Sequence, residues 1–172
     1  TALVKDIFSG TGSSAPTNFL VIGSTLYFRA TGSTSGVELW KSDGTPAGTV
    51  LVKDVFSGIS SSNPANLADV NGTLFFSATD STANGIELWK SDGTAVGTVL
   101  VNDINPGSSS SSPANLEAVG STLFFSAGIT GASGTELWKS DGTAAGTVLV
   151  LDINAGSVSS SPTLLVDAGG TL

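Results

Sequence analysis

The stretch Glu87-Leu88-Trp89-Lys90-Ser91-Asp92-Gly93-Thr94 is repeated in this chain of 172 residues, and its spacing decides the fold prediction. The other two copies begin at Glu38 and Glu136, so neighbouring copies lie about 49 residues apart. Propeller blades, which are built from four short strands, have periods of about 40–50 residues. The repeat therefore predicts a series of similar β-rich units.

Each unit is expected to contain four short strands joined by turns. In the stretch that begins at Pro64, the segments that predict strands are 67–70, 73–78, 86–90 and 98–104. Asn71-Gly72, between the first two, suits the positive φ of a two-residue hairpin. No segment shows the 3.6-residue apolar spacing of a helix. The sequence predicts an all-β fold of tandem four-stranded antiparallel blades, β-propeller-like, with an open helical array of blades as the alternative.

The chain is interpreted as a single repeat domain, 1–172. Its units are 1–48, 49–97, 98–146 and a partial unit, 147–172. Residues 1–10 match only a fourth strand, and the last residues match a first strand and the opening of a second at Thr171-Leu172. Because propellers close with about four to eight blades, we expect these units to belong to a longer array or an assembly.

The apolar pattern favours blades that are covered on both faces. Leu74, Phe75 and Phe76 are consecutive, whereas a sheet with one solvated face would alternate apolar and polar residues. Each complete unit also carries one tryptophan, which we expect to fill the space between neighbouring blades. These residues are Trp40, Trp89 and Trp138.

The composition excludes several classes of protein. The chain has no Cys and no His, which excludes a thiolate nucleophile, a sulfur-ligated zinc site and the usual general base near pH 7. Its 14 acidic and 6 basic residues give a net charge of -8, which disfavours nucleic-acid binding. No apolar run approaches about 18 residues, so membrane insertion is not expected.

Acidic residues recur in register, and such repetition favours structural over catalytic roles. Asp43, Asp92 and Asp141 stand in Ser-Asp-Gly-Thr, where an Asp side chain accepts hydrogen bonds from turn amides. The alternative for these three is a calcium ligand, since hard cations prefer carboxylate oxygen. Apart from calcium, no cofactor is expected. Glu87 is expected to meet a cross-strand partner, and no catalytic residue is predicted.

Residues 87–98 resemble the repeat known by its consensus ELW-x-x-DGT-x-x-GT, and 38–49 and 136–147 match it as well. That repeat occurs in long tandem arrays of bacterial proteins that are mostly predicted to be secreted or surface-attached. The resemblance implies a β-propeller-like array outside the cell or at its surface. Ser-Asp-Gly-Thr is also similar to the Asp-box hairpin of sialidase-type propellers, which implies a turn role and no catalysis.

These features together predict a non-enzymatic extracellular structural protein that self-assembles into a surface layer, a fibre or an adhesin scaffold. Its expected partner is itself, as a homo-oligomer or polymer formed through unpaired blade edges. The alternative is a glycan- or protein-binding propeller lectin or adhesin, with Trp40, Trp89 and Trp138 as candidate binding residues.

Overall fold

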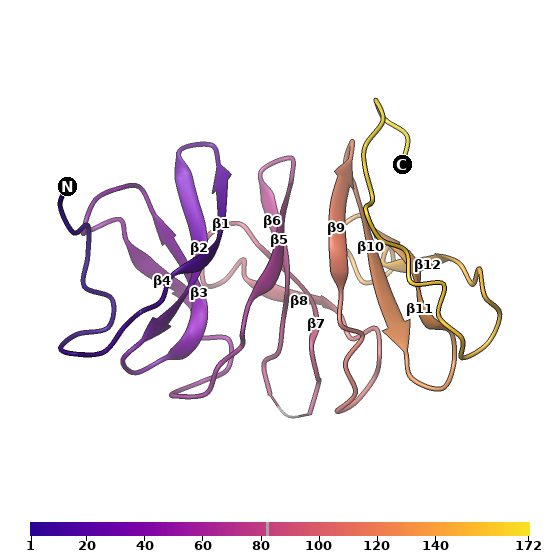
Figure 1. The fold of residues 1–172 in the computed structure, drawn as a ribbon, viewed down its shortest axis with the longest axis horizontal. Helices are drawn as coiled ribbons and strands as arrows, with labels where there is room; N and C mark the ends of the chain where they lie inside the picture. Colours follow the sequence, from indigo (N-terminus) through magenta and orange to yellow (C-terminus); the bar gives the residue numbers. More distant parts are fainter. Residues whose placement is uncertain (82) are drawn as a thin grey trace.

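The computed structural model describes residues 1–81 and 83–172, and within these ranges it is all-β, with twelve strands and no helix (Figure 1). Blade 1 contains β1 (Thr17–Ile22), β2 (Thr25–Gly32), β3 (Gly36–Ser42) and β4 (Val50–Lys53). Blade 2 contains β5 (Ala65–Val70), β6 (Thr73–Ala78), β7 (Glu87–Ser91) and β8 (Val99–Asn102). Blade 3 contains β9 (Ala114–Val119), β10 (Thr122–Ile129), β11 (Gly134–Ser140) and β12 (Val148–Leu151).

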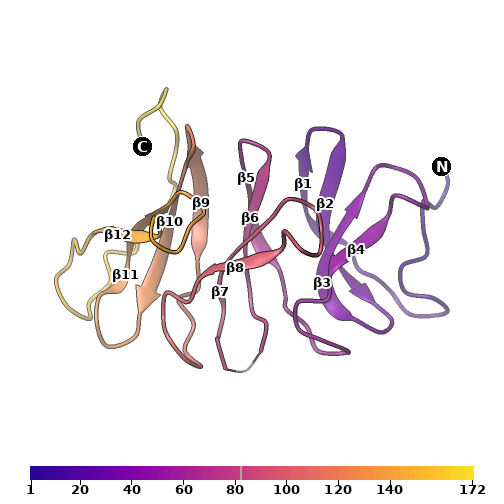
Figure 2. The same cartoon turned by 180° about the vertical axis from the view of Figure 1, so that it is seen from behind.

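Each blade is a four-stranded antiparallel meander in which consecutive strands pair. The three sheets stand side by side in an open row, with the termini at opposite ends (Figures 1 and 2). The predicted all-β fold of β-propeller-like blades is confirmed, and over residues 1–81 and 83–172 the three sheets do not close into a ring.

The chain's two ends differ from the strands that the sequence predicts. Residues 1–10 and 152–172 contain no strand, although they match a fourth strand and the start of a new blade. The physical reason is the ladder itself: a strand requires a neighbour that accepts its backbone hydrogen bonds. Within the described ranges no third strand lies beside residues 1–10, and no second strand lies beside residues 152–172.

A bulge in the first strand ties each blade to the next one. Asn18, Asn66 and Asn115 adopt positive φ at the register shift of β1, β5 and β9, a conformation that Asn tolerates better than most residues. Each Asn Nδ2 donates to a proline carbonyl of the following unit. These bonds are Asn18 to Pro64 (3.4 Å), Asn66 to Pro113 (3.0 Å) and Asn115 to Pro162 (3.3 Å).

The apolar cores lie between the blades. Tyr27 and Leu39 of blade 1 pack with Leu74, Phe76 and Trp89 of blade 2. The same arrangement recurs one unit later, and its buried members include Phe75, Leu88, Phe125 and Trp138. The third-strand Leu therefore faces the following blade and the Trp faces the preceding one, as the sequence predicted for the tryptophans of blades 2 and 3.

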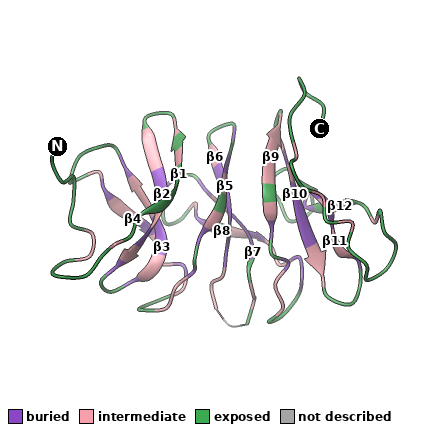
Figure 3. Ribbon diagram, viewed as in Figure 1, coloured by how far each residue is buried: buried purple, intermediate pink, exposed green. Residues whose placement is uncertain are grey.

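Residues between neighbouring blades are buried, whereas residues at both ends of the row of blades are exposed (Figure 3). No helix in the described part of the chain is long and apolar enough to cross a membrane.

Replacing Trp89 with Ala is expected to lower the free energy of unfolding by about 3–5 kcal/mol, because its indole fills the core between blades 1 and 2. Trp40→Ala is the matched control. Trp40 is half-buried at the end of the row, so its loss is expected to cost less. Urea unfolding followed by circular dichroism measures both variants, and equal losses would contradict this account of the core.

Candidate functional site

The glutamate that opens each Glu-Leu-Trp motif is fully buried. The Glu87 carboxylate accepts hydrogen bonds from the backbone N of Ile104 (3.0 Å), the backbone N of Ser111 (2.8 Å) and Ser111 Oγ (2.5 Å). Glu38 has the same partners one unit earlier, at Val55 and Ser62. Glu136 repeats them at Ile153 and Ser160. A buried carboxylate is tolerated only when its oxygens are satisfied in this way.

The residue before each glutamate binds the same crossover through its backbone. Ile86 N donates to Ser110 Oγ (2.8 Å), and Ile86 O accepts from Ser112 N (3.1 Å). The crossover segments share the sequence Ser-Ser-x-Pro, as in Ser110 to Pro113. We call this unit the carboxylate clamp: the Glu and its preceding residue on the third strand, bound to the Ser-Ser-x-Pro crossover that leads to the next blade.

The sequence interpretation of Glu87 was wrong. The register of β7 pairs Glu87 with Ala78 on β6, but the carboxylate binds the crossover rather than a side chain across the sheet. A signal for the clamp is present in the sequence, because each Glu stands 24 residues before the second Ser of Ser-Ser-x-Pro. The sequence prediction did not use this spacing and paired Glu87 across the sheet instead.

The pKa values of the three clamp carboxyls do not all shift in the same direction. Burial raises the pKa of Glu38 and Glu87, although hydrogen bonds from Ser62 and Ser111 pull it down. At Glu136 burial also acts upward, but the hydrogen bonds from Ser160 and neighbouring backbone groups together outweigh it, and the pKa lies below its ordinary value. The third clamp lies at the end of the row, where no complete blade follows among the described residues.

The Ser-Asp-Gly-Thr aspartates close the turns between the third and fourth strands. Asp92 Oδ1 accepts from Thr94 N (2.8 Å) and Thr94 Oγ1 (2.7 Å), and these bonds lower its pKa. Asp43 and Asp141 make the same bonds with Thr45 and Thr143. Across 1–81 and 83–172, no group of three or more His, Cys, Asp or Glu is placed to hold a metal ion. Calcium binding at these aspartates stays a prediction.

The tryptophans proposed as binding residues lie mainly inside the stack. Trp89 and Trp138 are buried between blades, and Trp40 is half-buried at the first blade. Stacking against a ligand requires an accessible ring face, which the two buried indoles do not offer. The structure therefore places Trp89 and Trp138 at successive interfaces and Trp40 at the open end of the row, so the three side chains do not form one site.

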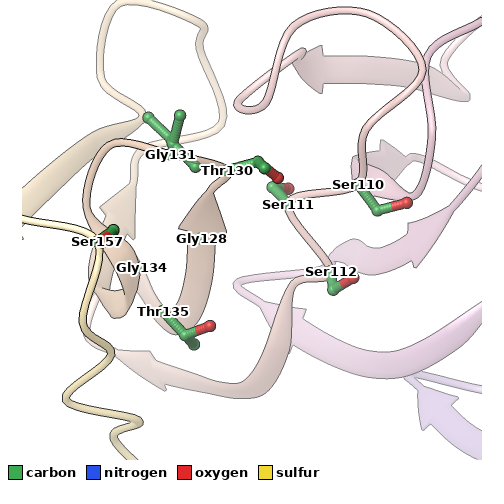
Figure 4. Close-up of a pocket in the computed structure, with 10 residues that line it drawn as sticks. Ser110, Ser111, Ser112, Gly128, Thr130, Gly131, Gly134, Thr135 and Ser157 are labelled. Atoms are coloured by element: carbon green, nitrogen blue, oxygen red, sulfur yellow. The ribbon is translucent and has the colours of Figure 1, made fainter.

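A polar pocket of about 230 Å³ opens beside the second clamp, between the crossover 110–112 and the β10–β11 hairpin end at residues 128–135 (Figure 4). Its lining consists of hydroxyl side chains, glycines and one isoleucine. The hydroxyl residues are Ser110, Ser111, Ser112, Thr130, Thr135 and Ser157. No ionisable side chain lines the pocket as described, so it offers hydrogen bonds but neither a charge nor an acid–base group.

An apolar cleft of about 410 Å³ lies on the outer side of blade 1, and we call this surface the N-terminal end face. Leu3, Val4, Phe19 and Phe28 line the cleft, and Ser14 lies at its wall. The Phe19 and Phe28 rings are 6.0 Å apart between centroids. An exposed cleft of this volume with a mainly apolar lining is typical of a surface that binds another molecule.

No protein-family model matches this chain, and no curated protein sequence matches it. Among solved structures the chain is similar to a novel α-L-arabinofuranosidase from Clostridium thermocellum, with 16% sequence identity and a TM-score of 0.40. The match covers 90% of this chain and 54% of that chain, so this chain spans about half the length of the enzyme.

The matched protein is an enzyme, and on this finding the predicted function is wrong. That prediction was a non-enzymatic extracellular structural, self-assembling protein, with a propeller lectin or adhesin as its alternative. The prediction failed for a physical reason, because the absence of His and Cys does not exclude catalysis by a pair of carboxyl groups. In addition, one fold can carry many different functions. At 16% identity and a TM-score of 0.40, this likeness places no activity or catalytic residue on this chain.

The raised pKa of Glu87 determines whether its contribution to stability rises or falls with pH. The folded state holds the Glu87 proton more tightly than the unfolded chain, so this contribution is present at low pH and is lost as the pH rises above the ordinary value of 4.5. The difference in unfolding free energy between the native chain and Glu87→Gln is therefore expected to fall with rising pH. Urea unfolding at a series of pH values measures it.

Glu136→Gln is the matched control, because the pKa of Glu136 is lowered. Its contribution is present above the ordinary value and is lost as the pH falls through the lowered pKa, so the corresponding difference is expected to grow with rising pH. The same slope for both variants would contradict the assigned environments of the two carboxyls.

Proposed function

We propose that this chain functions as a blade-accepting part of a larger β-propeller, whose open end faces bind further four-stranded repeat units. One observation carries the proposal: equivalent residues are buried inside the row and exposed at its ends. Val52 and Val101 are 5% and 6% exposed, whereas their counterparts Val4 and Val150 are 42% and 43% exposed. Covering such positions removes apolar surface from water, which is worth about 25 cal/mol per Å².

The leucines of the third strands are likewise buried inside the row and more exposed at its end. Leu39 and Leu88, which face a following blade, are fully buried, whereas Leu137 at the end of the row is half-buried. Ile153, the counterpart of the buried Val55 and Ile104, is exposed. These residues belong to a core that forms between two blades, and at the end of the row only one of the two blades is present. Another blade of the same repeat would supply the complementary side of this core.

Polar contacts between blades show the same unfinished pattern. Lys41 Nζ donates to the carbonyl of Gly93 (2.9 Å), and Lys90 Nζ donates to the carbonyl of Gly142 (2.7 Å). Each bond joins the third strand of one blade to the Ser-Asp-Gly-Thr turn of the next. Lys139, the third of the series, is exposed, and a further Ser-Asp-Gly-Thr turn would supply its acceptor.

In this proposal the repeated acids hold the crossovers and the turns of each blade in place. Glu87 and its two counterparts are engaged by crossover donors, and Asp92 and its counterparts by turn donors. Membership of the ELW-x-x-DGT-x-x-GT repeat family and an extracellular or surface location stay predictions.

A chain with one additional blade tests the proposal. Thr1 occupies the position of Thr49, Thr98 and Thr147, so joining a copy of residues 113–146 directly to Thr1 adds one blade in register. Hydrogen exchange followed by mass spectrometry is expected to show slower exchange over residues 1–8 and 17–22 than in the native chain, because the added blade covers the N-terminal end face.

The control carries Leu137→Asp in the added copy only, which places a charge where the following face must be apolar. This variant is expected to lose the added protection. If residues 1–22 exchange at the native rate in the four-blade chain, or if the added copy itself exchanges as an unfolded chain, the proposal is wrong.

A further inference from the structure

The segment Ser13-Ser14-Ala15-Pro16 has the sequence of a clamp crossover and the same local geometry. Ala15 has a φ of 41°, close to the 50° of Asn63 and the 51° of Ser112 and Ser161 at the equivalent position. Thr31 N donates to Ser14 O (2.8 Å), just as Thr79 N donates to Ser62 O (3.0 Å) in the next unit. The crossover half of a clamp is therefore already formed at the N-terminal end face.

The strand half of this clamp is missing from the part of the chain that the structure describes. Ser61 and Ser110 accept through Oγ from the residue before a clamp glutamate. Ser13 Oγ instead accepts from Ala15 N within its own crossover, at 3.3 Å. Among residues 1–81 and 83–172 no carboxylate bonds Ser14, whereas Ser62, Ser111 and Ser160 each hold one. Ser14 is half-buried and Ala15 is exposed.

The apolar cleft beside this half-clamp has the position of a missing leucine. Its lining residues Val4, Leu26 and Phe28 correspond to Val52, Leu74 and Phe76, which contribute to the core that buries Leu39. In each motif the leucine directly follows the clamp glutamate. One incoming strand could therefore place its carboxylate at Ser14 and its next side chain in the cleft.

Residues 1–8 are already held where the fourth strand of a preceding blade belongs. Lys5 Nζ donates to the carbonyl of Thr49 (2.7 Å), as Lys53 Nζ of β4 donates to the carbonyl of Thr98 (2.8 Å). A third strand that docked here would gain a backbone ladder with residues 2–5, as β3 does with β4. The backbone of residues 2–5, the hydrogen-bond donors at Ser14 and the apolar cleft would therefore all contact the same type of strand.

We infer that the N-terminal end face binds the third strand of a further repeat unit through a buried glutamate, with the sequence Gly-x-Glu-Leu-Trp as its recognition element. The inference rests on the proposed function and deepens it by naming the partner segment. The glutamate accepts from Ser14 N, Ser14 Oγ and Ile7 N, which correspond to Ser62 and Val55 in the first complete clamp. The following leucine fills the cleft.

The glycine in this element has a steric reason. Gly36 and Gly85 have a φ of 62°, and a Cβ on either would collide with the crossover backbone at Ser60 or Ser109. A strand without Gly two residues before the glutamate could not approach the crossover this closely. The element therefore selects for a repeat-type strand over an arbitrary acidic β-strand.

The four-blade chain described above allows a double-mutant cycle between Ser14 and the glutamate of the added copy. Ser14→Ala and Glu136→Gln, the latter in the added copy only, are made singly and together. Hydrogen exchange of the added blade measures its opening equilibrium. Because hydrogen bonds to charged groups are the stronger ones, each single change is expected to raise opening about tenfold or more, and the double change is expected to add little to either.

Two controls separate the possible failures. Ser33→Ala, at an exposed loop position, is expected to leave the opening unchanged and to act additively with Glu136→Gln. Ser14→Ala in the native chain is expected to leave stability unchanged, since no carboxylate there depends on it. If the added blade forms but the Ser14 and glutamate effects are additive, the inference is wrong and the proposed function stands. If no added blade forms, the proposed function itself has failed.

Discussion

A buried carboxylate between the third strand and the following crossover is the interaction on which this architecture depends. Removing Glu38 or Glu87 from water is unfavourable unless its oxygens are satisfied, and three donors of the crossover satisfy each one. Those donors lie in the segment that leads to the next blade. The clamp therefore fixes the path by which one sheet follows another, and a defect in it would displace the next blade as a whole.

The clamp and the apolar core impose different requirements on neighbouring blades. Packing of Leu39 against Leu74 and Phe76 needs only complementary shape and is non-directional. The clamp requires Ser-Ser-x-Pro in one conformation, with a positive φ before the proline. Burial thus supplies most of the favourable free energy, and the clamp specifies how the blades are arranged. This division explains why a glutamate with a raised pKa is retained inside an otherwise apolar stack.

Much of the fold could be predicted from the sequence, because periodicity and turn chemistry are local. The strands of blade 2 begin and end within a few residues of their predicted positions, and Asn71-Gly72 forms the predicted hairpin with positive φ. The clamp could not be derived in the same way. Its partners stand 24 residues apart, and neither the Glu-Leu-Trp motif nor the Ser-Ser-x-Pro motif by itself indicates that Glu87 binds Ser111. Function was predicted least well, because the amino-acid composition excludes some kinds of chemistry but does not indicate which of the remaining functions the chain has.

The two ends of the row are not equivalent, and the difference lies in particular side chains. At the N-terminal end face the crossover, the cleft and Lys5 are arranged as in an internal interface. In the partial unit, Leu164 stands where the earlier units carry Asn18, Asn66 and Asn115, and it adopts the same positive φ of 55°. Leucine is poorly suited to that conformation, and it has no amide to donate to the proline carbonyl of a following unit. The asparagine tie between blades therefore ends at blade 3, whereas the receptor for a third strand is intact at blade 1. If further blades bind as proposed, the N-terminal end face is therefore the better prepared of the two sides.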